Sequence, residues 1–370
     1  MSNIDDKLVS IYSSHAVYLS RLGAQFGNNA IPYLQRIENQ TYAILNSFRA
    51  NAAITSEVRR EVQRQINEIT RTELQAYTTQ YKLDNKEFGA NEVDFNANVL
   101  TSALTNYQAA IPTTQAITSL VNSTPMSLGT GSYTTYNRYV TGYHKQYTSK
   151  IDDIIRAGFL NGTTMGEVTS AIKDQLPGAI EQSKRGAKQM ARTATNYYAN
   201  KAMEATVNVN DEVVKGYEFI ATLDSRTSRQ CSSLDGNKYK STDNKRPRFP
   251  LHPNERSVYG YWIDDRYKYD NEDSKRNSNF TDVDGVRTPK KVSSAKTYYD
   301  ELRGMKAVDQ DSLLGSPTLG KAFRKMNKNG DIDIFRKQLI DSSYQPISIS
   351  ELKKKDNELG RILKAQIKGG

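Results

Sequence analysis

The clearest structural signals in this chain lie between residues 216 and 257. It reads GYEFIATLDSRTSRQCSSLDGNKY over 216–239 and RPRFPLHPNERS over 246–257. Residues 217–222 alternate between two faces, with Tyr217, Phe219 and Ala221 on one of them, which is the pattern of a strand. The alternation predicts a strand that delivers the chain to Leu223-Asp224.

Tight turns are expected directly after that strand. Asp224 can accept backbone N–H bonds in an Asx-type turn, and Arg226 is placed to pair with its carboxylate. Asp235-Gly236 is a hairpin-type turn signal that predicts a second strand at Lys238-Tyr239. This part of the chain is therefore expected to fold as a strand-turn-strand module.

The second half of the stretch predicts a rigid return of the chain through Pro250, Leu251, His252 and Pro253. The imidazole there can tie two loops together by hydrogen bonds. Cys231 lies in the polar sequence SRQCSSLDG, with only Arg229 nearby to acidify its thiol, so a buried or incidental cysteine is favoured over a nucleophile. We expect these residues to serve structure rather than catalysis.

Helices are predicted on both sides of the module. Upstream, Thr164-x-x-Glu167 fits a capping box, Pro177-Gly178 is expected to end that helix, and the alanine-rich segment 179–206 predicts a long helix. Downstream, helices are expected at 293–306, 317–328 and 331–341. A last helix is expected from Ser350, after the capping box Ser348-x-x-Glu351, and runs into the basic tail KKKDNELGRILKAQIKGG.

The front of the chain also predicts helices, over 4–47 with a break at Ile31-Pro32 and along one apolar face of 54–77. In contrast, the 43 consecutive residues 95–137 carry no charged side chain, which suggests a loop-rich contact region or a hinge. We therefore predict an α-rich α+β fold in four regions. They are a helical docking region at 1–111, a polar hinge or linker at 112–150, the segment with the small mixed α/β module at 151–292, and C-terminal helices with a basic tail at 293–370.

The composition narrows the class of protein. The chain has 370 residues and a net charge of +10, of which +2 lies in 1–150 and +8 in 151–370. A single cysteine excludes an internal disulfide framework and suits a reducing cytosol. No apolar run approaches the roughly 20 residues of a membrane helix, and MSNIDDKLVS lacks the basic start of a signal peptide. These features exclude the disulfide-rich, secreted and membrane classes.

No catalytic motif stands out. The chain has no phosphate-binding glycine loop, no His-Glu-x-x-His and no Gly-x-Ser-x-Gly, and its three histidines, His15, His144 and His252, lie in unrelated contexts. A nuclease would need clustered acids or a histidine-based metal site, for which LHPNER with Asp224 and Asp235 is the one candidate. The sequence therefore does not favour an enzyme.

The ordered set of motifs resembles the Mu F-like phage head-morphogenesis family. The family pattern reads approximately as Ala-Arg-Thr-Glu on a helix, then Asp-x-Arg-Thr-Cys-x-x-Cys, Leu-Asp-Gly and Pro-x-His-Pro-x-Cys-Arg-Cys. The matching residues are Arg192, Thr193, Asp224, Arg226, Thr227, Cys231, Leu234, Asp235, Gly236, Pro250, His252 and Pro253. Specific agreement covers about 185–350, while 1–150 share only general helicity with the family.

The chain departs from the family pattern at its cysteines. Many relatives carry a four-cysteine box that could hold Zn²⁺ tetrahedrally. Here Ser228, Glu255 and Ser257 stand at three of those positions, so Cys231 remains, with His252 as a further ligand. Two ligands do not make a structural site, and we expect neither zinc nor another cofactor.

The resemblance implies a minor head protein of a tailed phage, made in the host cytoplasm and bound at the portal inside the capsid. Such proteins help head assembly and accompany the DNA, sometimes leaving with it. The implied partners are the portal protein, other head or scaffold proteins and genomic DNA, with no membrane. The candidates for non-specific DNA contact are Lys184, Arg185, Lys188, Lys245, Arg246 and Arg248.

Three alternatives stay open from the residues themselves. The basic residues can form an ordinary solvated surface. The protein can be a DNA-acting or host-acting enzyme that the virion delivers. It can also be a purely structural capsid or connector component without DNA contact.

Overall fold

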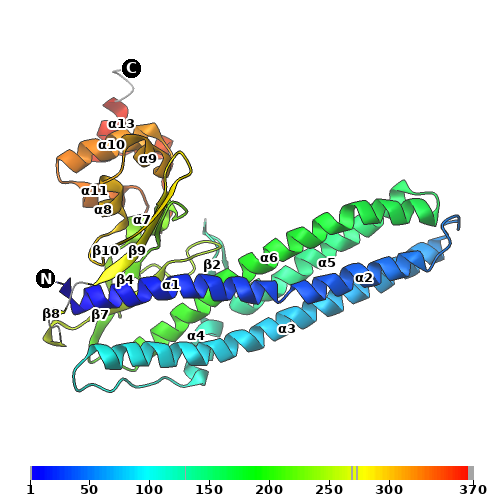
Figure 1. Ribbon diagram of the computed structural model, residues 1–370, viewed down its shortest axis with the longest axis horizontal. Helices are drawn as coiled ribbons and strands as arrows, with labels where there is room; N and C mark the ends of the chain where they lie inside the picture. The colour runs from blue at the N-terminus through cyan, green and yellow to red at the C-terminus, as the bar shows by residue number, and fades with distance from the viewer. Residues whose placement is uncertain (1, 130, 268–269, 272–273, 366–370) are drawn as a thin grey trace.

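The computed structural model describes residues 2–129, 131–267, 270–271 and 274–365 of the chain. A long helical arm extends from a compact head, so the outline is that of an L (Figure 1). The arm contains α2 (Ile31–Asn46), α3 (Ser56–Ala103), α5 (Tyr136–Asn161) and the first part of α6 (Met165–Asn208). α1 (Ile4–Asn28) packs along α6 where the arm reaches the head. Helices from the whole front half of the chain thus share one core with the head.

Threonine caps set where the arm helices begin. The side chains of Thr55, Thr113, Thr135 and Thr164 accept backbone N–H bonds in the first turns of α3, α4 (Thr114–Ser123), α5 and α6. Such bonds satisfy donors that have no partner within the helix. The capping box predicted at Thr164 is confirmed, because Glu167 also accepts the Thr164 N–H. The predicted break at Ile31-Pro32 is confirmed as the start of α2.

The uncharged segment 95–137 is largely ordered into elements. It contains the end of α3, all of α4, and a short pair formed by β2 (Met126–Ser127) and β3 (Tyr133–Thr134). The hydroxyl of Tyr197 on α6 donates to the backbone carbonyls of Val121 and Thr124, and Ile117 and Met126 are buried. The segment therefore packs against α6, while the predicted hinge at 112–150 and the other regional boundaries stay predictions.

The expectation that Pro177-Gly178 ends a helix is wrong. α6 continues through both residues from Met165 to Asn208. Proline removes one backbone hydrogen bond and glycine adds backbone freedom, so both weaken the helix locally. However, Leu176, Ala179 and Ile180 are buried in the bundle on either side of the pair. Packing of this continuous apolar face therefore outweighs the local stop signal.

We expect Gly178→Ala to raise the free energy of unfolding by about 1 kcal/mol, because alanine is the better residue in a helix interior. Gly178 is exposed, and an added Cβ would meet nothing within 4 Å. The matched control is Gly27→Ala in α1, whose Cβ would lie 2.5 Å from the Cα of Lys188 on α6. Urea unfolding should show a gain for the first variant and a loss for the second. A gain for both would contradict the close contact of α1 with α6.

The head contains two three-stranded sheets. In the first, β4 (Val214–Ile220) lies between β6 (Lys238–Lys240) and β7 (Val258–Ile263) and is antiparallel to both. In the second, β9 (Lys275–Thr281) pairs antiparallel with β10 (Arg287–Ser293) and parallel with β5 (Leu223–Asp224).

Short elements connect the strands of the head. The short α7 (Arg229–Leu234) follows β5, η1 (Asp265–Tyr267) follows β7, and β1 (Ser2–Asn3) pairs with β8 (Asp270–Asn271). The two strands predicted around the Asp235-Gly236 turn are confirmed as β4 and β6, and Gly236 has a φ of +78°.

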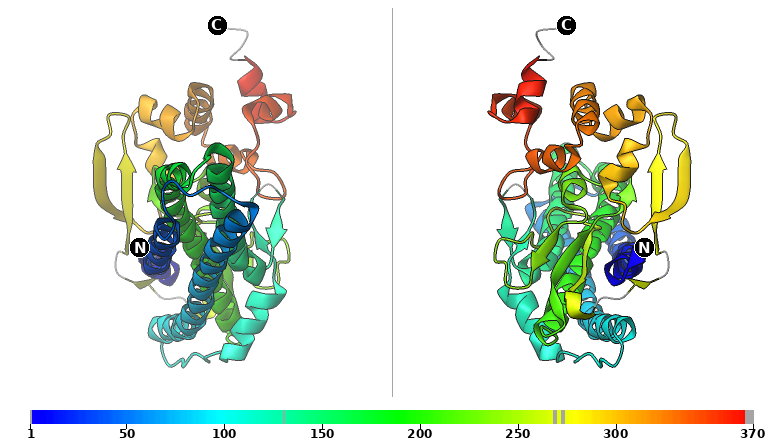
Figure 2. Two further views of the ribbon diagram at one scale, coloured as in Figure 1. Left: turned by 90° about the vertical axis from the view of Figure 1, so that its right-hand side faces the viewer. Right: turned by 90° about the vertical axis from the view of Figure 1, so that its left-hand side faces the viewer.

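Short helices complete the head around a second core. They are α8 (Tyr298–Arg303), α9 (Ala307–Leu313), α10 (Pro317–Lys328), α11 (Ile332–Gln338), α12 (Ile349–Lys354) and α13 (Glu358–Ala365). Phe323 and Phe335 pack there against Tyr299, together with Phe280 from the second sheet. Figure 2 shows these helices at the top of the head, above the helices of the arm.

The helices predicted in this region are confirmed at 317–328, at 331–341 as α11, and at the Ser348 capping box as α12. The last helix does not continue through the basic tail, because α12 ends at Lys354 and a separate helix, α13, begins at Glu358. The helix expected at 293–306 is wrong in its first part, because Ser293 ends β10, and α8 begins at Tyr298. Residues 366–370 of the predicted basic tail lie outside the described residues. The α-rich α+β fold is confirmed. Within the described part of the chain, no helix has the length and apolar character needed to cross a membrane.

Candidate functional site

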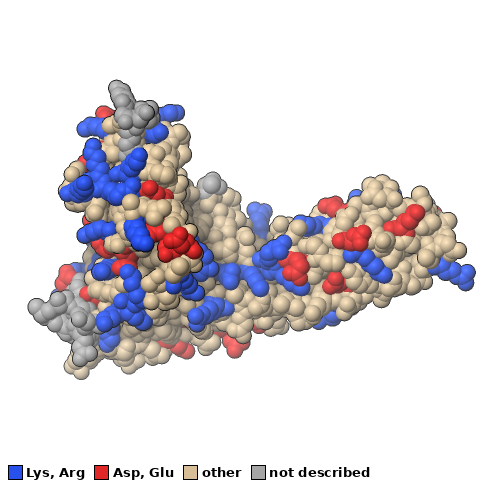
Figure 3. Space-filling model, turned by 45° about the horizontal axis from the view of Figure 1, so that its top comes forward, with Lys and Arg blue, Asp and Glu red and all other residues tan. Residues whose placement is uncertain are grey.

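A cleft runs beside the strand-turn-strand module where the arm meets the head. Its walls come from α1 and α6, from the motif segments 221–226 and 252–256, and from β9 and β10, and its volume is about 1030 Å³. We call it the basic cleft, because its described lining includes one acid, Asp224, and the cations Arg21, Arg192, Arg226, Arg256, Arg287, Lys290 and Lys291. Figure 3 shows Lys and Arg side chains gathered over the head and its junction with the arm, while both signs alternate farther along the arm.

Several cations of the basic cleft are not neutralised by neighbouring acids. Arg226 shares the Asp224 carboxylate with Arg256: its side chain is 80% exposed, and its guanidinium lies 3.7 Å from Asp224. Arg21, Arg192 and Lys291 make no ion pair with any residue that the structure describes. The buried Nε of Arg192 also has no hydrogen-bond partner among these residues. The cleft therefore presents unpaired positive charge from three elements, α1, α6 and β10.

Asp224 anchors the first turn of the module. Its carboxylate accepts the Arg226 N–H at 2.9 Å, as the predicted Asx-type turn requires, and the Thr227 hydroxyl at 3.2 Å. Its stronger charge partner is Arg256, which contacts both oxygens and places Nη2 2.8 Å from Oδ1. Burial alone would raise the pKa of Asp224, but the hydrogen bonds and charge of Arg256 hold that pKa below its usual value. Arg256 was missed as a site residue, although it stands at the Arg of the Cys-Arg-Cys pattern.

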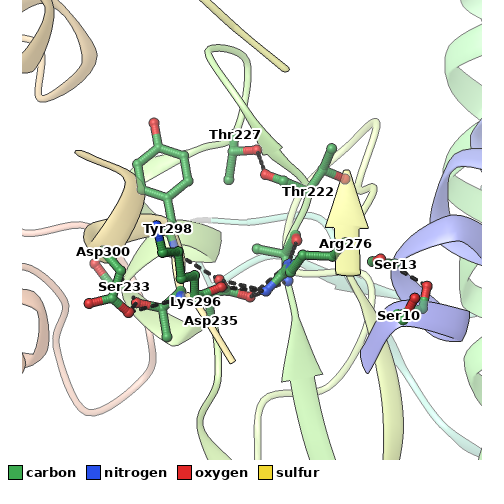
Figure 4. Close-up of polar contacts among 12 residues, drawn as sticks. Ser10, Ser13, Thr222, Thr227, Ser233, Asp235, Arg276, Lys296, Tyr298 and Asp300 are labelled. Atoms are coloured by element: carbon green, nitrogen blue, oxygen red, sulfur yellow. Dashed lines mark hydrogen bonds and ion pairs between the residues drawn. The ribbon is translucent and has the colours of Figure 1, made fainter. Parts of the chain in front are cut away.

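Asp235 links the strand-turn-strand module to the second sheet and to α8 (Figure 4). Its carboxylate is fully buried, with Oδ1 accepting the N–H of Ala221 and Oδ2 accepting that of Tyr298, both at 2.8 Å. The buried guanidinium of Arg276 on β9 lies 3.2 Å from Oδ2 and also donates to the Ala221 carbonyl. One carboxylate thus joins the end of β4, the second sheet and the start of α8.

Residues 250–257 form the return segment, which begins at the cis peptide Phe249-Pro250 and leads into β7. A row of polar side chains on α6 binds this segment. Three bonds carry this contact: Asn254 N–H to Thr193 Oγ1 at 2.9 Å, Asn196 Nδ2–H to the Ser257 carbonyl at 2.9 Å, and Tyr259 N–H to Asn200 Oδ1 at 3.2 Å. The spacing of three and four residues places the α6 donors and acceptors on one helix face. This contact gives a physical reason for the helix motif and the Pro-x-His-Pro motif to occur together.

Cys231 of α7 meets His252 and Glu255 of the return segment. The Cys231 Sγ lies 3.2 Å from His252 Nε2 and 3.4 Å from each Glu255 carboxylate oxygen, and His252 Nε2 lies 3.5 Å from Glu255 Oε2. The Ser228 hydroxyl oxygen lies 3.0 Å from the same imidazole nitrogen. Burial, and then the charge of Glu255, raise the pKa of the Cys231 thiol well above its usual value.

These residues fit the ligand chemistry of zinc. A thiolate, an imidazole and a carboxylate are all established zinc ligands, and the three donor atoms lie within 4.8 Å of one another. The sequence motif predicts two ligands, because Glu255 stands where the family pattern has a cysteine. A carboxylate at that position was the signal for a third ligand, and the tertiary structure brings it against Cys231.

The six residues predicted to contact DNA do not line the basic cleft. Arg246 is buried, pairs with Glu204 at 2.7 Å and covers the ring of Tyr217, so its charge stabilises the head. The other five lie on exposed or half-buried surface and are Lys184, Arg185, Lys188, Lys245 and Arg248. In contrast, five of the motif residues do line the cleft, namely Arg192, Asp224, Arg226, His252 and Pro253.

Comparison with known proteins agrees with the motifs. Residues 149–257 match the family described as Phage Mu protein F like protein. No curated protein and no solved structure was found to match the chain. The matched segment includes α6, β4, β6 and the return segment up to residue 257, and therefore every motif residue from Arg192 to Pro253. Over residues 149–257, the chain is thus similar to the Phage Mu protein F like family.

Proposed function

We propose that this protein is a minor head protein of a tailed phage that is bound at the portal inside the capsid and contacts the packaged DNA through the basic cleft. The family match supports the coarser part, a role in phage head morphogenesis and a place in the virion. The observation that carries the DNA contact is the cleft itself, which gathers seven cations and one acid along the family motifs.

A DNA backbone suits the basic cleft for electrostatic reasons. Lys and Arg neutralise phosphates and release condensed counterions, which gives affinity without sequence preference. Arg21, Arg192 and Lys291 come from α1, α6 and β10, so a strand in the cleft would meet cations on several sides. Lys290 is less available, because its Nζ lies 2.7 Å from Glu301.

Two triple variants of the full chain with equal loss of charge test the DNA contact. The cleft variant carries Arg21→Ala, Arg287→Ala and Lys291→Ala, and the control carries Lys184→Ala, Arg185→Ala and Lys245→Ala. We expect the cleft variant to bind duplex DNA at least about tenfold more weakly at low salt. The slope of log K against log salt should also fall by about 0.9 for each phosphate contact removed.

The control variant should keep affinity and salt dependence close to those of the wild type. Equal weakening of both variants would assign the binding to diffuse surface charge and contradict a role of the cleft. A wild-type chain that shifts no DNA at low salt, where phosphate contacts are strongest, would overturn the DNA contact altogether.

The portal part of the proposal is supported by the arm, which extends its helices away from the head (Figure 1). The test is to localise the protein in intact virions and in virions emptied of DNA. Retention at the portal vertex would support docking there, and loss with the DNA would support ejection. An even distribution over the shell would instead favour a purely structural capsid component.

We propose that the role is not enzymatic. A nuclease that uses Mg²⁺ needs carboxylates free to hold the ion. Asp224 is engaged by Arg256, and Asp235 is buried against Arg276. Mg²⁺-dependent DNA cleavage that disappears in His252→Ala would contradict this and support the enzyme alternative.

A further inference from the structure

We propose that Cys231, His252 and Glu255 form a three-ligand site for one zinc-class divalent ion, with the Ser228 hydroxyl or a water in the fourth position. The metal is of the class that the family's four-cysteine box implies, but the ligand set is peculiar to this chain. The proposed metal site does not depend on portal binding or on DNA binding.

The separations of the donor atoms lie within about 0.3 Å of those around a tetrahedral ion. With Zn–S near 2.3 Å and Zn–N and Zn–O near 2.0 Å, neighbouring ligand atoms lie about 3.3–3.6 Å apart. The observed separations are 3.2 Å for sulfur to nitrogen, 3.4 Å for sulfur to oxygen and 3.5 Å for nitrogen to oxygen. The three atoms therefore already outline one face of such a tetrahedron.

Outer contacts orient two of the ligands in the way that metal sites require. His252 Nδ1 lies 2.9 Å from the Pro253 carbonyl and donates to it, which leaves the lone pair on Nε2, the nitrogen that faces Cys231. Glu255 Oε1 accepts the backbone N–H groups of Arg256 at 2.9 Å and Ser257 at 2.8 Å. Both donors fix the direction of the carboxylate, because a side chain held by two amides cannot rotate freely.

The charge balance and the solvent access of the three ligands also support a metal site. A thiolate and a carboxylate supply two negative charges against the two positive charges of the ion, so a loaded site is neutral in its buried position. Cys231 is 2% exposed, whereas the His252 side chain is 28% exposed and lines the basic cleft, which offers a route of entry. On binding, the S–H bond is lost, the sulfur bonds to the metal, and the proton passes to solvent.

A bound ion would tie α7 to the return segment. Ser228 and Cys231 belong to the start of α7, while His252 and Glu255 belong to the loop that leads into β7. These two segments are otherwise joined here by the weak hydrogen bonds of a thiol and an imidazole. The ion would thus perform the cross-linking role of a structural zinc with one cysteine in place of four.

Cobalt titration of the full, metal-stripped chain tests the site. Co²⁺ in a tetrahedral site with a thiolate ligand has a sulfur-to-metal charge-transfer band and visible absorption, which report on geometry and on the ligand atom. We expect both signals to saturate at one equivalent and to disappear when Zn²⁺ is added. Cys231→Ser should abolish the charge-transfer band. Glu255→Gln should weaken Co²⁺ binding at least as much as loss of an outer-shell partner, which costs about 10–100-fold.

The matched control is His144→Gln, a histidine on the arm in α5, which should leave the titration unchanged. Thermal unfolding gives a second readout, since Zn²⁺ should raise the Tm of the wild type and the control but not of Cys231→Ser. A wild-type chain without the sulfur-to-cobalt band at saturating Co²⁺ would overturn the site. Equal Co²⁺ affinity in the wild type and in Glu255→Gln would remove Glu255 from it.

Discussion

Replacing Asp235 with alanine is expected to lower the free energy of unfolding by about 3–5 kcal/mol, the range measured when one partner of a buried ion pair is removed. The carboxylate is fully buried, and its two oxygens hold the backbone N–H groups of Ala221 and Tyr298 together with the Arg276 guanidinium. The variant leaves a buried guanidinium without its counterion and two amide donors without their acceptor. Chemical denaturation followed by circular dichroism measures the loss.

A surface pair provides the control for Asp235. Asp356 lies 3.3 Å from Arg361 with both side chains largely exposed, so Asp356→Ala should change stability little. Because Asp235 joins both sheets to α8, we also expect the signal of the C-terminal helices to be lost at lower denaturant in Asp235→Ala. A loss below about 1 kcal/mol would mean that the Arg276 contact does not anchor the head.

Glu218 should make the protein less stable as the pH rises from about 5 to 8. Burial, which outweighs the charge of Lys238, raises the pKa of Glu218 from 4.5 to about 7, and the charges of Asp5 and Asp235 add to the increase. The Glu218 side chain is 12% exposed, and its Oε2 lies 3.5 Å from Lys238 Nζ, which in turn lies 2.7 Å from Asp5. Above pH 4.5 the unfolded chain loses this proton, while the folded chain keeps it until about pH 7.

The stability from this carboxyl group is therefore complete below pH 4.5 and is lost as the pH rises through 7, by up to about 3 kcal/mol at 1.36 kcal/mol per pKa unit. Glu218→Gln should remove this dependence. Its stability should equal that of the wild type near pH 5 and exceed it by about 2–3 kcal/mol at pH 8. Urea unfolding at both pH values measures the difference. A wild type that is the more stable protein at pH 8 would show that pairing with Lys238 outweighs the cost of burying the charge.

The sequence predicted best those features that depend on neighbours in the chain. The capping boxes at Thr164 and Ser348 and the Asx-type turn at Asp224 each involve residues two to three positions apart, so their hydrogen bonds follow from local geometry. The stop expected at Pro177 was equally local, but it failed because the apolar face of α6 is buried on both sides of it.

The candidate site was predicted in part. The motifs contain five residues that line one cleft, namely Arg192, Asp224, Arg226, His252 and Pro253. Arg246 was named for its charge, yet it is buried against Glu204. Whether a basic side chain is available to a ligand depends on its burial and on its partner. Both are set by residues that lie far away in the sequence.

Local hydrogen bonding, periodicity and residue identity were enough to predict most of the helices, the turn between β4 and β6, and the motif set that resembles the Phage Mu protein F like family. Which charges face one another depends instead on the tertiary structure. It brought α1 and β10 around the motif to form the basic cleft, matched Asp224 with Arg256 from 32 positions away, and set Glu255 against Cys231. Contacts of this kind arise when distant segments pack into one core, and no local pattern in the chain specifies them.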